Sequence, residues 1–208
     1  MDWSSLVLLS TSDLGPIALD GRFVRLEPLR ENHAAALWEV ARGMDWGWML
    51  GALRSREEVD RRITERLNAE ERKAEYAFAV FLKPKNRMVG STSYLDVAPK
   101  RKIAEIGSTW YSSDVQGIVV NPECKYLLLK HAFEGWGAIR VQLGTDVKNV
   151  HSQRAILKLG AKFEGRLRNH GIRPDGSIRD SMLYSIISEE WPIVKKGLEA
   201  RIESFARL

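Results

Sequence analysis

The sequence predicts an α/β (α+β) fold, in which a mostly antiparallel, twisted sheet of about seven strands is flanked by helices. Three observations predict it. Strand-like and helix-like patterns follow one another along the chain, and polar turn signals join two pairs of strand-like runs. The 208 residues, 44% of them hydrophobic, suffice for one sizeable core. We expect an N-terminal extension over residues 1–15 and a single domain over residues 16–208.

The first half of the chain predicts a strand, two helices and three more strands. Residues 22–27 largely alternate charged and apolar side chains, as a half-buried strand does. A helix is predicted over residues 32–42 with Asn32 as its cap, and a second begins at Ser55, where Ser55 and Glu58 match a capping box. Three further strands are predicted over residues 76–82, 87–95 and 103–111. The polar turn between the first two of them predicts an antiparallel hairpin.

The second half alternates helices and strands. Residues 122–136 predict a helix with Asn121 as cap and Pro122 at its first position. A short strand over 139–143 and a helix over 149–159 follow, and Gly160 is placed to end that helix in a left-handed conformation. Residues 163–172 and 178–187 flank the turn signal Pro174-Asp175-Gly176 and predict a closing hairpin. A C-terminal helix is predicted over 189–208.

Composition narrows the function classes. The net charge of +5, from 32 Lys and Arg against 27 Asp and Glu, is mild, so no nucleic-acid partner is predicted. A single cysteine, Cys124, cannot form an internal disulfide, which favours a reducing compartment. The apolar stretch at residues 6–9 is far too short to span a bilayer. We therefore expect a cytoplasmic protein with no membrane contact, and no metal site is predicted.

Five short motifs occur in a fixed order. They are Ala104-Glu105-Ile106-Gly107 leading to Trp110; Gln116-Gly117 before the helix containing Glu123 and Glu134; Asn149-x-x-Ser152; Leu159-Gly160-Ala161-x-x-Glu164-Gly165; and Asp175-Gly176-x-x-Arg179-Asp180 leading to Tyr184-Ser185-Ile186. Over roughly residues 20–195 the chain thereby resembles the GCN5-related N-acetyltransferases (GNATs), and within them the ribosomal-protein alanine acetyltransferases. The resemblance implies the GNAT fold and acetyl-CoA as co-substrate. It also implies direct attack by a primary amine, on a protein N-terminus or a small molecule, and allows a homodimer.

A candidate cofactor loop precedes the helix predicted after residue 121. A strand, a Gly-containing loop and a helix start present free backbone N–H groups and the positive end of the helix dipole, which together can hold a pyrophosphate. The residues of this loop are Val115, Gln116, Gly117, Ile118, Val119 and Val120. Lys125, one turn further, could add a point charge. The alternative is an ordinary strand-to-helix connection with a solvated lysine.

The loop departs from the family pattern. When Gln116 is set at the start of the family's motif, Val119 and Asn121 occupy its two small-residue positions. A β-branched valine resists positive φ. We therefore expect the loop to take a different path or to hold the phosphates less tightly.

Acetyl transfer to an amine needs a base, an oxyanion donor and a proton for the thiolate. Glu105 resembles the family's general base, usually acting through water; an exposed strand carboxylate is the alternative. The resemblance assigns the oxyanion to a backbone N–H within residues 106–111, where Gly107 permits a bulge. The tyrosine found in many members is replaced by Ile156, and Ser152 resembles the proton donor of the alanine acetyltransferases. Asn149 would bond the pantetheine amide.

Several of these residues have plainer explanations. Asn149 as a helix cap and Ser152 as a first-turn residue need no ligand. His170 lies beside Gly171, where the alanine acetyltransferases carry a glutamate base, and could compensate for the missing glutamate, although a strand histidine is more often structural. The aromatic and methionine side chains of residues 44–49 suggest a wall around a substrate, with core packing or a dimer contact as alternatives. If the departures abolish transfer, the chain is a catalytically impaired coenzyme A-binding or regulatory module of the same fold.

Overall fold

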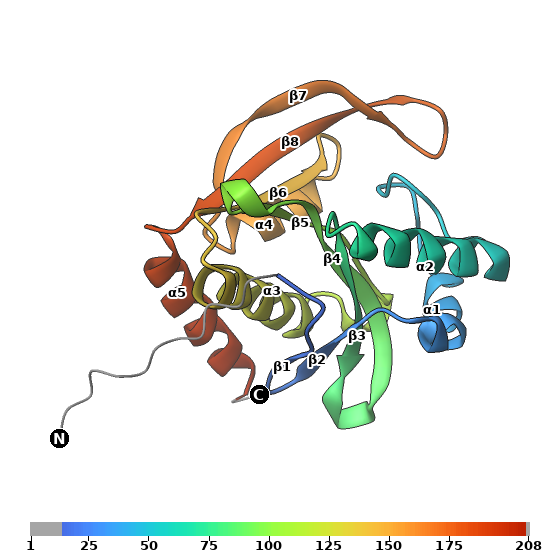
Figure 1. Cartoon of the computed structure of the whole chain (residues 1–208), viewed down its shortest axis with the longest axis horizontal. Coiled ribbons are helices and arrows are strands. Elements are labelled where there is room, and N and C mark those ends of the chain that lie inside the picture. Colours follow the sequence, from blue (N-terminus) through green and yellow to red (C-terminus); the bar gives the residue numbers. More distant parts are fainter. Residues whose placement is uncertain (1–13, 207–208) are drawn as a thin grey trace.

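The computed structural model describes residues 14–206, which form an eight-stranded open sheet in the order β1-β2-β3-β4-β5-β6-β8-β7 (Figure 1). The strands are β1 (Leu19–Asp20), β2 (Val24–Pro28), β3 (Tyr76–Leu82), β4 (Arg87–Ala98), β5 (Ile103–Tyr111), β6 (Arg140–Asp146), β7 (Lys162–Ile172) and β8 (Ile178–Ile187). Only β5 and β6 pair in parallel among these described strands, so the predicted, mostly antiparallel sheet is confirmed. The sequence patterns missed β1, because two residues show no alternation.

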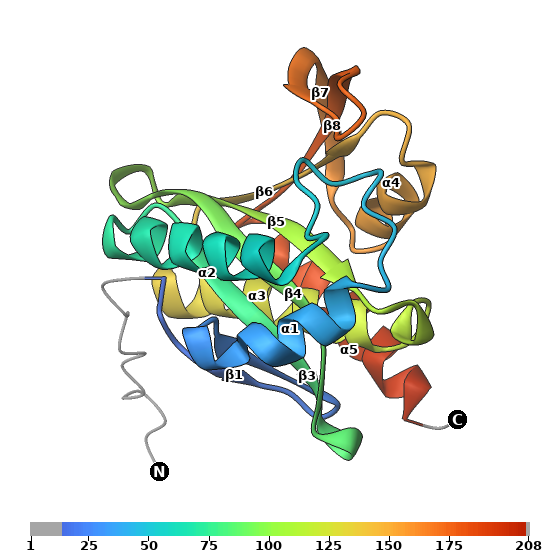
Figure 2. The same cartoon turned by 90° about the vertical axis from the view of Figure 1, so that its right-hand side faces the viewer.

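Helices cover both faces of the sheet (Figures 1 and 2). They are α1 (Ala34–Ala41), α2 (Arg56–Glu71), α3 (Val120–Lys130), α4 (Val150–Leu157) and α5 (Trp191–Phe205). One core lies between α1, α2 and the sheet, and a larger core lies between the opposite face and α3, α4 and α5. Within residues 14–206 no helix is both long and apolar enough to cross a bilayer.

The two predicted N-caps of the first helices have different outcomes. Ser55 caps α2 as predicted, because its Oγ accepts the Glu58 N–H at 3.2 Å. The Glu58 carboxylate accepts from the Arg54 N–H, one residue before the position a capping box requires. Asn32 does not cap α1; it lies inside a 3₁₀ turn, Glu31–His33, that precedes the helix.

The predicted start of α3 is wrong by two residues. The helix begins at Val120, so Asn121 and Pro122 lie inside its first turn, and Val119 is the N-cap residue. The sequence pattern was misleading because a Pro in the first turn is compatible with more than one start position. The same helix continues into a π-helical segment, His131–Trp136, that ends at Gly137 with a φ of 75°.

A buried carboxylate fixes α3 against the first strands. Glu123, only 3% exposed, accepts hydrogen bonds from the backbone N–H groups of Arg22, Phe23 and Val24 at 2.7–2.8 Å. Three charge-assisted bonds from consecutive amides hold the start of β2 on the helix. Because α3 begins at the candidate cofactor loop, this anchor also positions that loop.

The C-terminal third follows the predicted pattern closely. Gly160 has a φ of 97° after α4, and Gly176 has a φ of 83° in the β7–β8 turn, as expected. The last helix begins at Trp191 and ends at Phe205, inside its predicted bounds. Residues 207–208, like residues 1–13 of the expected N-terminal extension, lie outside the described residues. Leu14 is fully buried in the larger core.

Candidate active site

The candidate site lies where β5 and β6 diverge. The two strands pair in parallel through three residue pairs, Ile103–Glu105 with Arg140–Gln142. Beyond this seam, β5 continues to Tyr111 and β6 to Asp146 without further pairing between them in the described structure. Both strands therefore carry unpaired backbone along facing edges, and Glu105 is the last β5 residue of the seam.

A bulge in β5 lies just beyond the seam. Gly107 pairs with Ser93 of β4, and Trp110 pairs with Ser91, so β5 holds one extra residue between these pairs. The predicted bulge is confirmed, but Ser108 rather than Gly107 adopts the left-handed conformation, with a φ of 47°. A Cβ at Gly107 would stand 2.6 Å from Leu95 Cδ1, so a side chain there would force Leu95 to move.

Side chains from both faces of the sheet hold the bulge. Arg66 of α2 donates from Nη2 to Ser108 Oγ at 3.1 Å and forms an ion pair with Glu75. From the opposite face, Lys125 of α3 donates from Nζ to Thr109 Oγ1 at 2.6 Å. A left-handed serine is unfavourable by itself, and these contacts stabilise it at this place.

Glu105 points to the face opposite the larger core. Its neighbours Ala104 and Ile106 belong to that core, and strand side chains alternate between faces. The carboxylate accepts a hydrogen bond at 2.8 Å from Gln142 Nε2, across the seam. Its Oε1 also lies so close to Gly107 and Gly144 that a Cβ at either position would stand 3.1 or 3.4 Å from it. The two glycines thus leave room for this carboxylate.

The electrostatic environment of Glu105 is mixed. Burial raises the pKa of its carboxyl group, the Gln142 hydrogen bond opposes that rise, and Asp96 adds to it. His170 and Arg179 of the β7–β8 hairpin lower the same pKa. A half-buried carboxylate with a raised pKa has the properties of a general base working near neutral pH.

The hairpin residues singled out by sequence have structural partners. His170 Nδ1 lies 3.0 Å from Ser181 Oγ. Asp180 forms a cross-strand ion pair with Arg166. Arg179 is oriented toward Asp146, with its Nε 3.8 Å from a carboxylate oxygen.

The candidate cofactor loop takes a path that spares the valine any strain. Gly117 has a φ of 78°, and a Cβ there would meet nothing within 4 Å. Val119 has a φ of −63° and is buried, which is ordinary for a β-branched residue. Ile118 is exposed, and Gln116 donates from its side chain to the Tyr111 carbonyl at 3.3 Å. In the described chain, α3 carries no side-chain cap at this end.

The α4 residues partly follow the plainer expectation. Asn149 Oδ1 accepts the Ser152 N–H at 2.9 Å, so Asn149 caps the helix. Ser152 is half-buried in the first turn, and Ile156 is buried in the larger core. Since α4 begins four residues after Asp146, both polar residues lie at the β6 side of the diverging strands.

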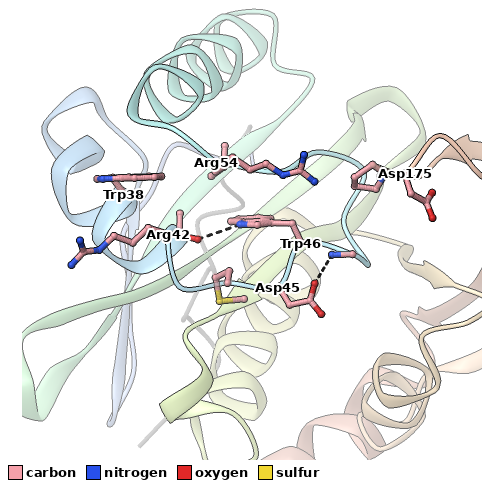
Figure 3. Close-up of a pocket in the computed structure, with 11 residues that line it drawn as sticks. Trp38, Arg42, Asp45, Trp46, Arg54 and Asp175 are labelled. Atoms are coloured by element: carbon pink, nitrogen blue, oxygen red, sulfur yellow. Dashed lines mark hydrogen bonds between the residues drawn. The ribbon is translucent and has the colours of Figure 1, made fainter.

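The aromatic loop divides between core and surface. Trp46 is buried, with its ring 5.1 Å from that of Trp110 in an edge-on arrangement, whereas Trp48 is 44% and Leu50 57% exposed. A pocket of about 450 Å³ lies between this loop and the β7–β8 turn (Figure 3). Its charged lining residues are Arg42, Asp45, Arg54 and Asp175. Glu105 is not among the residues that line it.

Sequence reasoning missed Gln142 and misplaced Lys125. Gln142 lies between the core residues Val141 and Leu143, so the sequence could have shown that its side chain is on the opposite face of the strand. The sequence could not have shown that Gln142 pairs with Glu105. Lys125 lies three and four residues before the buried Leu128 and Leu129, a spacing that puts it on the buried face of α3. Its amine contacts the sheet and not the loop where a point charge was expected.

Cys124 is a buried structural residue. Burial raises the pKa of its thiol to about 12, so the thiolate is scarce at neutral pH. Cys124 packs as a small residue in the larger core.

Comparisons with known proteins agree with this geometry. Residues 24–162 match the family model described as an acetyltransferase (GNAT) domain. A solved structure from T. thermophilus, whose acetyltransferase activity is itself inferred, is 36% identical in sequence. The alignment covers 90% of this chain and 97% of the T. thermophilus chain, with a TM-score of 0.80. No curated protein matches the chain significantly.

Two more distant structures share the fold. Mycobacterium smegmatis RimJ in complex with CoA-disulfide is 22% identical, with 85% of this chain and 88% of its own covered, at a TM-score of 0.75. A Salmonella typhimurium acetyltransferase that modifies the N-terminal serine of ribosomal protein L7/L12 is 19% identical, with 82% and 99% covered, at a TM-score of 0.74. The chain belongs to the GNAT family of N-acetyltransferases, which take the acetyl group from acetyl-CoA.

Proposed function

We propose that this enzyme transfers the acetyl group of acetyl-CoA to the primary amine of a protein N-terminus by direct attack. The observation that carries the proposal is the placement of Glu105 at the end of the β5–β6 seam, beside the bulge in β5. A base and an unpaired strand edge with free backbone groups then lie within one site. These are the parts that amide formation from a thioester needs.

The donor would be held between the diverging strands and the start of α3. Residues 115–120 fit its pyrophosphate, because Gly117 leaves open space and the uncapped helix start supplies N–H donors and the positive dipole end. Asn149 and Ser152, on the β6 side, would contact the pantetheine arm. Ser152 would supply the proton that the departing sulfur takes up.

Glu105 would remove a proton from the acceptor amine through a water molecule. An amine is nucleophilic only when it is neutral, so the base must be ionised while the acceptor loses its proton. A carboxylate whose pKa is raised by burial is a stronger base than an exposed one. A backbone N–H of the bulge would stabilise the oxyanion.

The acceptor proposal draws on the surface beyond Glu105. Exposed Trp48 and Leu50, together with the pocket at the β7–β8 turn, offer apolar and charged contacts that suit a short peptide better than a bare alkylamine. The fold shared with the S. typhimurium enzyme is compatible with such a substrate. A small-molecule amine is the alternative acceptor, and a homodimer and a cytoplasmic location stay predictions.

The base is tested by Glu105→Gln. We expect turnover at neutral pH to fall by about 100-fold or more, with acetyl-CoA affinity unchanged in calorimetric titration. Unchanged turnover would remove Glu105 from the mechanism. A panel of N-terminal peptides, polyamines and amino acids, followed by release of free thiol, identifies the acceptor class.

A binding module is the second candidate function. Two departures favour it: Val119 stands at a small-residue position of the loop, and Ile156 replaces the family's usual tyrosine. Binding of acetyl-CoA without thiol release for any acceptor would support the module. Thiol release with one peptide class would support the enzyme.

A further inference from the structure

Lys125 is a buried amine at the bulge of β5. The residue is 5% exposed, although it lies only one turn inside α3. Its Nζ donates to Thr109 Oγ1 at 2.6 Å, and Thr109 Oγ1 lies 2.7 Å from Thr92 Oγ1. The amine is therefore held against the part of β5, after Glu105, that no longer pairs with β6.

The charge of this lysine is poorly compensated. In the described part of the chain, Thr109 is its one hydrogen-bond partner, although an ammonium has three N–H donors, and no carboxylate lies within ion-pair distance. Burying a charged group in this way costs free energy unless hydrogen bonds or an opposite charge compensate for it. Glu123, two residues earlier on the same helix, is also buried, but its carboxylate accepts hydrogen bonds from three backbone N–H groups. Lys125 is compensated much less than this neighbour.

We propose that the Lys125 ammonium stabilises the negative charge that develops on the acetyl donor, first on the carbonyl oxygen and then on the departing sulfur. This inference rests on the proposed function, which brings the thioester to the bulge. The amine lone pair forms the C–N bond, and the C–S bond breaks with its electron pair going to sulfur. Ser152 passes a proton to that sulfur, and the proton that Glu105 took from the amine returns through water to Ser152, so atoms and charge balance.

The titration of the lysine fits this role. Burial lowers the pKa of Lys125 to about 8, against the opposing effects of Cys124 on α3 and Glu105 on β5. At neutral pH the amine is thus still mostly charged, whereas above about pH 8 the charge is lost. Its contribution to transfer should disappear over the same range.

The direct test measures the thiol pKa of bound coenzyme A from its ultraviolet thiolate absorbance. In the wild-type complex we expect that pKa about one to two units below the value in Lys125→Met, because an opposite charge within a few ångströms favours the thiolate. Lys130→Met is the matched control, since Lys130 is an exposed residue of the same helix. Equal thiol pKa values in wild type and Lys125→Met would overturn the proposal.

Kinetics supply a second readout that a purely structural lysine would not move. Lys125→Met should lower kcat by about 100-fold at neutral pH with little change in KM for acetyl-CoA, and the ratio of wild-type to variant kcat should shrink above about pH 8. Methionine suits a buried site, so we expect an undiminished melting temperature.

Different results would overturn the proposed function and the proposed role of Lys125. If wild-type protein neither binds coenzyme A nor releases thiol, the proposed function fails and the role of Lys125 falls with it. If wild type binds and transfers while Lys125→Met matches it in thiol pKa and kcat, only the role of Lys125 is overturned.

Discussion

At the scale of single residues, Glu105 shows how one carboxyl is tuned by opposing effects. Burial and Asp96 raise its pKa and favour the neutral form, whereas the Gln142 amide, His170 and Arg179 lower the pKa and favour the carboxylate. Gln142 is the neighbour with direct contact, at 2.8 Å. In the proposed mechanism Gln142 would therefore position the Glu105 carboxylate and influence the pH range over which it acts as a base.

Gln142→Leu should move the acid limb of kcat/KM to higher pH. The substitution removes a hydrogen bond to the charged form, so the pKa of Glu105 rises further above its ordinary value. Turnover requires the ionised base and is lost as pH falls through that pKa, so a higher pKa brings the loss at a higher pH. A pH–rate profile measures it, with Glu105→Gln as the control in which this limb vanishes. An unshifted limb would mean that another group is the base.

Glu123→Gln should destabilise the fold by about 2–3 kcal/mol. The amide keeps one acceptor oxygen but presents N–H to at least one of the three backbone donors, and bonds to a charged group are the stronger kind. Urea unfolding measures the loss. The control is Glu203→Gln, which removes an exposed ion pair with Arg22 and should cost less than about 1 kcal/mol. Equal losses would show that burial adds nothing to the Glu123 contact.

At the scale of elements, α3 begins just after a turn in which Gly117 has a left-handed conformation, and no side chain caps the start of the helix. Gly117→Ala should cost about 1 kcal/mol of stability, because its φ of 78° is unfavourable for a residue with a Cβ. Acetyl-CoA affinity should fall as well, since the loop must shift. Calorimetry and melting measure the two effects.

The same chemical change in α5 is the control for that experiment. Gly197 is an exposed helical residue with space around it, so Gly197→Ala should raise stability by about 1 kcal/mol and leave acetyl-CoA affinity unchanged. If both alanines behave alike, the left-handed turn at Gly117 has no bearing on the donor site.

How much of the structure the sequence predicts also differs from one element to another. Among the described residues, sequence patterns located the five α-helices and all strands longer than two residues, but not by periodicity alone: β7 is almost wholly exposed and was predicted from the turn signal that follows it. The pairing of Glu105 with Gln142 was not predictable, because a parallel register depends on how a helix-containing connection packs. The buried position of Lys125 was missed because its charge suggested a solvated side chain, although its spacing to Leu128 indicated the core.

At the scale of the whole molecule, the sheet consists of two antiparallel parts joined by a short seam. Strands β1–β5 form one part and β6–β8 the other, with three parallel pairs between them. Asp146, at the far end of β6, ties that strand to the hairpin through Arg173, with bonds of 2.6 and 2.9 Å. Antiparallel pairing holds each part together, and the edges beyond the seam face one another without mutual pairing among the described residues.

A donor bound between these edges should therefore protect both of them at once. We expect acetyl-CoA to slow amide hydrogen exchange over residues 107–111 of β5 and 143–146 of β6, and to raise the melting temperature. Exchange in β2 and β3, which lie away from the gap, should change little and is the internal control. Exchange mass spectrometry with and without acetyl-CoA measures this. Protection confined to the start of α3 would mean that the phosphates bind there while the diverging strands hold nothing, which would contradict the proposed donor site.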